Sequence, residues 1–126
     1  MIANLISVCI GGMIGTGLRY AIKVNMSSTA FTLPTFVSNA AGCLLLGIII
    51  AIGEQSNMSD VLRLGLIVGC CGALTTFSTI IYDIIKLLSE QAFSEAVTYF
   101  MATHLMGIAM FGIGFIVTTK CIKWLF

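Results

Sequence analysis

The segment from Gly69 to Thr79 holds the residues whose types and spacing are best suited to handling ions. It reads Gly-Cys-Cys-Gly-Ala-Leu-Thr-Thr-Phe-Ser-Thr, so two glycines precede a run of β-branched and hydroxyl residues that makes a poor helix. A helix that breaks inside a membrane frees backbone groups, whose carbonyl ends hold cations and whose N–H ends face anions. The residues leave two alternatives open: a break near Thr75, or a continuous helix in which hydroxyls bond to the preceding turn.

Asn39 is the second position with potential chemistry. It lies well inside an apolar stretch, with Thr35 and Ser38 on neighbouring turns. A side-chain amide carries two donor hydrogens and one acceptor oxygen, and an unpaired amide in hydrocarbon is costly. Asn39 is therefore predicted either to form a hydrogen bond between helices or to be a donor that lines a polar path.

The elements that must position these residues are membrane helices. Of the 126 residues, 59% are hydrophobic and 9% are charged, against about 25% charged in a soluble domain. Charged residues divide the chain into four apolar stretches, each long enough to span a bilayer. Period-2 alternation is absent, which argues against a β-barrel. We expect one all-α domain over residues 1–126, with both termini on one side of the membrane and helices at about 2–22, 33–53, 62–88 and 96–119.

The lysines and arginines do not favour one orientation in the membrane. Three of them (Arg63, Lys120 and Lys123) fall on the side of the termini, and three (Arg19, Lys23 and Lys86) fall on the opposite side. The positive-inside rule therefore gives no preferred direction. A chain that inserts both ways can pair with an inverted copy of itself, so the charge pattern favours an antiparallel, dual-topology dimer.

Several classes of protein are disfavoured by composition. A net charge of +1 gives no reason to expect a nucleic-acid partner. The five cysteines form no C-x-x-C pair and no metal-ligand spacing, so they are interpreted as small packing residues. An enzyme is not expected, because no nucleophile–base pair occurs in the apolar stretches or in their connecting loops.

Three motifs together resemble the CrcB/Fluc family of fluoride channels. They are Gly11-Gly12-x-x-Gly15-x-x-x-Arg19-Tyr20, Asn39-x-x-Gly42 and Gly72-x-x-Thr75-Thr76-Phe77-Ser78-Thr79. The resemblance covers the whole chain in order. Its third motif is specific, whereas a glycine-rich first helix alone would be a weak signal.

The resemblance implies a multi-pass protein of the inner (plasma) membrane that lets fluoride leave the cytoplasm passively and so reduces its toxicity. It implies two pores in an antiparallel dimer and a structural Na⁺, not transported, on the dimer axis. The implied Na⁺ ligands are the backbone carbonyls of Gly72 and Thr75 from both protomers, which suits a hard cation. The residues implied for the pore are Asn39, Phe77, Ser78 and Thr79, and Arg19 is expected in a vestibule, with snorkelling to the membrane interface as its alternative.

Four positions depart from the family pattern. Ala73 replaces a glycine and Asp83 replaces a glutamate, and both changes are mild. Ile80 stands where the family has its second pore phenylalanine, and Ile108 stands where it has a serine. The lost aromatic edge and hydroxyl favour a heterodimer with a paralogous subunit, whereas the balanced charges favour a homodimer. We lean toward the dual-topology homodimer.

One rival function and one isolated residue complete the expectations. A small multidrug-resistance exporter also has four helices, but it needs a membrane-embedded carboxylate for proton exchange. The acidic residues of this chain are expected at loops and helix ends, which argues against that exporter. His104, in the fourth stretch, is interpreted as a hydrogen-bonded packing residue, with a donor on a polar path as the alternative.

Overall fold

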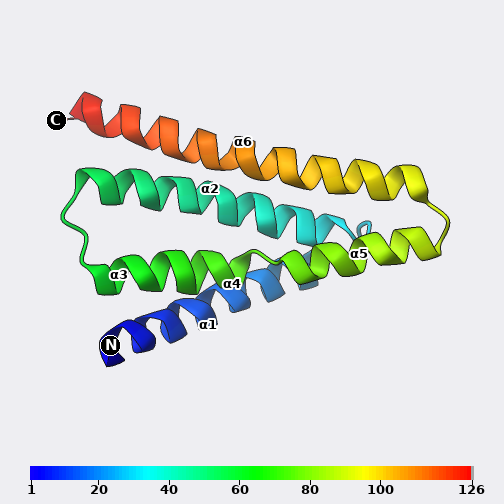
Figure 1. Ribbon diagram of the computed structural model, residues 1–126, viewed down its shortest axis with the longest axis horizontal. Helices are drawn as coiled ribbons and strands as arrows, with labels where there is room; N and C mark the ends of the chain where they lie inside the picture. The colour runs from blue at the N-terminus through cyan, green and yellow to red at the C-terminus, as the bar shows by residue number, and fades with distance from the viewer. Residues whose placement is uncertain (126) are drawn as a thin grey trace.

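The computed structural model describes residues 1–125 and consists of four long helical segments that lie side by side, each running opposite to the one before it (Figure 1). The first is α1 (Ile2–Asn25) and the second is α2 (Leu33–Gln55). The third segment is composite and consists of α3 (Asp60–Leu64), a π-helix η1 (Gly65–Cys71), α4 (Gly72–Leu74) and α5 (Phe77–Ser89). The fourth is α6 (Phe93–Leu125).

All four segments are long and apolar enough to cross a membrane, as the sequence predicts. The helices extend further than expected at several ends, most of all α6, whose 33 residues correspond to about 50 Å. A hydrocarbon core is about 30 Å thick, so the basic C-terminal turns of α6 reach into the interface. Both termini lie at the same end of the molecule (Figure 1), which confirms the expected topology.

The packing of α1 against the third segment depends on missing side chains. A Cβ atom on Gly11 would overlap the carbonyl of Gly65, and a Cβ on Gly15 would overlap the carbonyl of Cys70. On the third segment, a Cβ on Gly69 would lie 2.6 Å from the carbonyl oxygen of Val8. Small residues let backbones approach closely in lipid, where no hydrophobic force drives helices together. These glycines therefore bring α1 against η1 and the helix break.

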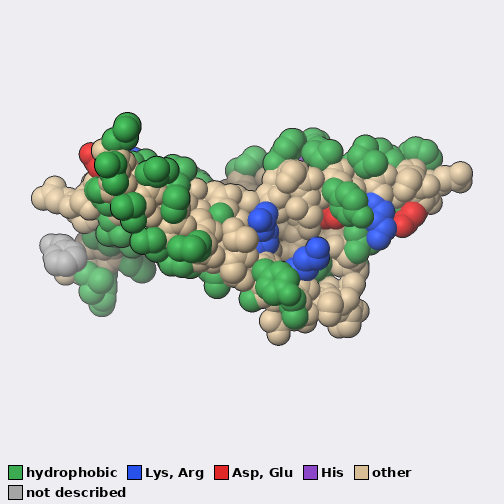
Figure 2. All heavy atoms as spheres, turned by 90° about the horizontal axis from the view of Figure 1, so that it is seen from below, with side chains coloured by type: hydrophobic (Ala, Val, Ile, Leu, Met, Phe, Trp, Pro, Cys, Tyr) green, Lys and Arg blue, Asp and Glu red, His purple; other side chains and the backbone are tan. Residues whose placement is uncertain are grey.

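The exterior of the protomer is apolar. Large hydrophobic side chains such as Ile2, Phe77 and Ile108 are exposed, the last at 72%. Figure 2 shows that apolar side chains cover much of the face seen from below, and that basic side chains interrupt them in the half toward the α5–α6 turn. Such a surface requires lipid or a second protein chain around it.

Candidate ion site at the break in the third helix

The third helix is broken at its middle, which confirms the predicted discontinuity. Thr75 (φ −79°, ψ 154°) and Thr76 (φ −152°, ψ 115°) are extended, between the end of α4 and the start of α5. Seven residues of π-helix and the short α4 precede the break, and π-helical turns are frequently found at functional sites. The alternative of a continuous helix is therefore excluded.

The break removes the normal hydrogen-bond donors of two carbonyls. In an unbroken helix the carbonyl of Gly72 would accept from Thr76 N, and that of Thr75 from Thr79 N. In the structure Thr76 N donates to Asn39 Oδ1 at 2.8 Å, and Thr79 N donates to Thr76 Oγ1 at 3.3 Å. The two carbonyls that the family resemblance implies as Na⁺ ligands thus lose their usual helical partners.

Gly72 is exposed on the surface of the protomer, and a Cβ there would meet only the carbonyl oxygen of Ile67, at 3.7 Å. Packing within the protomer therefore does not require a glycine at this position. The backbone carbonyls of Gly72 and Thr75 are the type of ligand that a hard cation takes.

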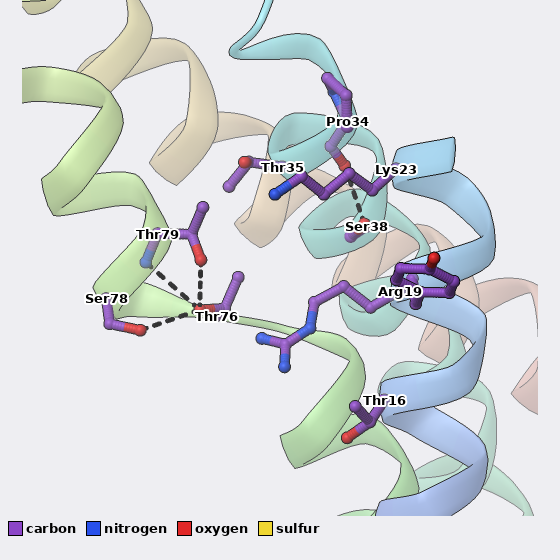
Figure 3. A pocket seen from close by; sticks show the side chains of 10 residues that line it. Thr16, Arg19, Lys23, Pro34, Thr35, Ser38, Thr76, Ser78 and Thr79 are labelled. Atoms are coloured by element: carbon purple, nitrogen blue, oxygen red, sulfur yellow. Dashed lines mark hydrogen bonds between the residues drawn. The ribbon is translucent and has the colours of Figure 1, made fainter. Parts of the chain in front are cut away.

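Thr76 caps α5 and joins three hydroxyls into one cluster. Its Oγ1 lies 3.2 Å from Ser78 Oγ and 3.0 Å from Thr79 Oγ1 (Figure 3). Backbone N–H groups at a helix N-terminus and the helix dipole both favour negative charge. Thr76 was not among the residues expected in the pore, although a threonine just before a helix start is a recognisable cap signal.

An open pocket of about 370 Å³ lies beside this cluster. Arg19 and Lys23 extend into it from α1, and the hydroxyl cluster forms the facing wall (Figure 3). Because Arg19 lies inside α1 rather than at its end, its guanidinium reaches this polar pocket. The complete lining is Thr16, Arg19, Tyr20, Lys23, Pro34, Thr35, Ser38, Thr76, Ser78 and Thr79. Two basic side chains and several hydroxyl groups make the pocket suited to a small anion.

The other two residues expected in the pore do not line this pocket. Asn39 is buried behind it, and its amide is hydrogen-bonded to the break. Phe77 begins α5 and is 65% exposed, so its ring points away from the protomer. Within the chain, therefore, Ser78, Thr79 and Arg19 come together, whereas Phe77 lies on the outer surface.

The two apolar departures from the family pattern lie in different places. Ile80 is 6% exposed and packs in a cluster with Leu87, Ala96 and Tyr99, so in this protomer it is a core residue and not part of the pocket wall. Ile108 lies on the outer face of α6. His104 is exposed on the same helix, where its Nδ1 lies 2.7 Å from the carbonyl oxygen of Phe100.

The placement of one acidic residue differs from expectation. Asp83 was expected at a helix end, but it is the seventh residue of α5 and is only 3% exposed. Tyr99 Oη donates to its Oδ2 at 3.0 Å, and both side chains are buried between α5 and α6. The spacing of charges along the sequence does not reveal this pair, because its members are 16 residues apart.

Together, the fold and this site define a small multi-pass membrane protein with a discontinuous helix whose freed backbone groups lie beside a cationic pocket. Residues 6–115 match the family described as "CrcB-like protein, Camphor Resistance (CrcB)". The chain belongs to this family.

Curated relatives cover most of the chain. A protein of Desulfotalea psychrophila is 32% identical over 121 residues, which are 94% of this chain and 94% of that protein. A protein of Acinetobacter baylyi is 36% identical over 109 residues (85% and 86% of the two chains), and one of Shewanella loihica is 39% identical over 98 residues (75% and 79%). Each of the three carries the name "Fluoride-specific ion channel FluC".

Proposed function

We propose that this chain is the subunit of a fluoride-specific channel through which fluoride leaves the cytoplasm passively. The observation that carries the proposal is the extended break at Thr75–Thr76, beside a pocket that contains Arg19 and a cluster of hydroxyls. The names of the relatives that span the chain support the same activity. Family membership and the four apolar helices make it a multi-pass membrane protein.

The residue types suit the chemistry of fluoride. Fluoride is small and strongly hydrated, so a selective path has to replace its water with hydrogen-bond donors. The hydroxyls of Ser78 and Thr79 and the positively polarised ring edge of Phe77 supply such donors. Arg19 and Lys23 raise the local concentration of anions at the mouth of the path, and neutral donors further in bind the ion without trapping it.

The proposal includes an antiparallel dimer, either of two identical chains or with a paralogous subunit. The exposed positions of Phe77 and Gly72 support it, because the Phe77 ring and the Gly72 backbone both lie on the outer surface of the chain. The carbonyls of Gly72 and Thr75 from two chains give four oxygen ligands, and Na⁺ bound there ties two broken helices together and adds positive field. Each chain also supplies the capped N-terminus of α5.

The test is fluoride efflux from liposomes that contain the purified chain alone, with chloride efflux measured in parallel. We expect fluoride to leave and chloride to be retained, and expression of this chain alone to restore growth of fluoride-sensitive cells. Absence of fluoride efflux from correctly inserted protein would contradict a homodimeric channel. If adding a paralogous subunit then restored efflux, the channel would be a heterodimer and not a homodimer.

The buried Asp83 favours one second candidate, a proton-coupled exporter of organic cations. Such an exporter needs an acidic residue inside the membrane, and Asp83 lies inside α5. The pocket beside the break, however, is lined by Arg19 and Lys23, which repel a cation. Efflux of a lipophilic cation driven by a proton gradient, with no fluoride flux, would select the exporter.

A further inference from the structure

The α2 motif Asn39-x-x-Gly42 contacts the broken backbone directly. Asn39 Oδ1 accepts from Thr76 N at 2.8 Å, while Nδ2 donates to the carbonyl of Thr35 at 2.9 Å and lies 3.5 Å from that of Thr76. The amide therefore pairs with both backbone groups of Thr76, as a neighbouring strand would. A primary amide has two donor hydrogens, and both are directed at carbonyls in this arrangement.

Gly42 lies on the same face of α2, one turn further along. A Cβ atom built there would overlap Cγ2 of Thr75, whereas the next nearest atoms, Leu74 Cγ and Thr75 N, lie at an ordinary 3.6 Å. The methyl group of Thr75 thus occupies the volume that a side chain at position 42 would need. The Thr75 hydroxyl is held separately, by a 3.0 Å bond to the carbonyl of Cys71.

We propose that Asn39 and Gly42 form a template that fixes the extended conformation of Thr75 and Thr76. Asn39 holds the backbone of Thr76 by hydrogen bonds, and Gly42 receives the methyl group of Thr75. Asn39 is then a positioning residue that acts through the break, rather than a donor to the permeating anion. These contacts do not depend on the proposed channel function, but the link from the template to fluoride flux rests on it.

The space that Gly42 leaves for the Thr75 methyl group predicts that a substitution at Thr75 can compensate for one at Gly42. Gly42→Ala should displace Thr75 and weaken the break, and adding Thr75→Ser, which deletes Cγ2 but keeps the hydroxyl, should restore it. Gly47→Ala is the matched control on α2: its Cβ would overlap the backbone of Phe111 on α6, so Thr75→Ser should not rescue it. The readouts are thermal stability and backbone amide exchange at residues 74–79. If Gly42→Ala alone fails to fold but the variant that also carries Thr75→Ser folds, that result is the expected rescue.

The hydrogen bonds of Asn39 are tested by amide exchange. Asn39→Ala should speed exchange of the Thr76 amide about tenfold, the equivalent of one buried hydrogen bond. Ser38→Ala is the control, because Ser38 is also buried but, among residues 1–125, its hydroxyl bonds only to Pro34 in its own helix. Unchanged exchange at Thr76 in Asn39→Ala, or a Gly42→Ala defect that Thr75→Ser does not reduce, would overturn the template.

Fluoride efflux is measured on the same variants to separate the two proposals. If wild-type protein shows the expected exchange pattern but conducts no fluoride, the channel fails and the template remains. If Asn39→Ala abolishes flux with the Thr76 amide still protected, Asn39 is a direct donor and the template fails.

Discussion

Replacing Tyr99 with phenylalanine should destabilise the protein by more than any other loss of a single hydroxyl on α5 or α6. Tyr99 Oη donates to Asp83 Oδ2 at 3.0 Å, and this is the one side-chain hydrogen bond that the structure gives this carboxylate among residues 1–125. Because Asp83 is 3% exposed and Tyr99 9%, the carboxylate has little access to water that could replace the lost donor.

The size of the effect follows from the environment of the pair. Neutral hydrogen bonds between membrane helices average about 0.6 kcal/mol, whereas bonds to charged groups contribute about 1.5–3 kcal/mol. We expect Tyr99→Phe to cost about 2 kcal/mol, which is roughly a thirtyfold change in the folding equilibrium. In an Asp83→Asn background the same substitution should cost only about 0.6 kcal/mol, since the acceptor is then neutral.

The assay is reversible unfolding in detergent, with both substitutions arranged as a double-mutant cycle. Tyr82→Phe is the control, because Tyr82 lies next to Asp83 in the sequence but its side chain is 66% exposed. A cost for Tyr99→Phe no larger than that for Tyr82→Phe, or a coupling energy near zero, would refute the reasoning.

Three further predictions concern the break, the packing of α1 and a turn. Thr76→Val keeps the shape of the side chain but removes the cap of α5, so it should cost about 1 kcal/mol in unfolding experiments and increase amide exchange at Thr79; unchanged exchange there would contradict the cap. Gly15→Ala should prevent close packing of α1 and abolish stable folding, whereas Gly17→Ala should be tolerated, because a Cβ at position 17 meets nothing within 4 Å. Equal melting temperatures of the two variants in a thermal-shift measurement would contradict this packing. Gln91 has a φ of 59°, so Gln91→Gly should raise stability by up to about 1 kcal/mol, and a decrease would show that its side chain is needed in the α5–α6 turn.

The comparison of expectation and structure is most instructive for the third helix. The glycines and the β-branched run around Thr75 predict a weak helix, and the break occurs there. The same run does not say which groups replace the lost helical bonds. Those partners are Asn39, 37 residues away in sequence, and the hydroxyl of Thr76. Helix propensity depends on neighbouring residues, whereas hydrogen-bond partners that are distant in sequence cannot be read from those neighbours.

Burial was the least predictable property. Ile80 and Phe77 are three residues apart on α5, yet one is 6% exposed and the other 65%. Lipid tails are as apolar as a protein core, so hydrophobicity alone does not tell whether an apolar residue such as Ile80 or Phe77 faces protein or lipid. Asp83 illustrates the same point: its place near the end of an apolar stretch predicted an acid at a helix end, and only the packing of α6 against α5 revealed its partner Tyr99.

The amino-acid sequence by itself determined the number of membrane spans and the common side of the two termini, and it located the weak helix segment around Thr75, because hydropathy and helix propensity act over short stretches of chain. Only the tertiary structure decided that Asn39 and Gly42 contact the break, that Arg19 shares a pocket with the hydroxyl cluster, and that Phe77 points outward. These features depend on how helices that are distant in sequence approach one another. In a membrane that approach is set by the fit of small residues and by hydrogen bonds between helices, neither of which is visible in any one segment.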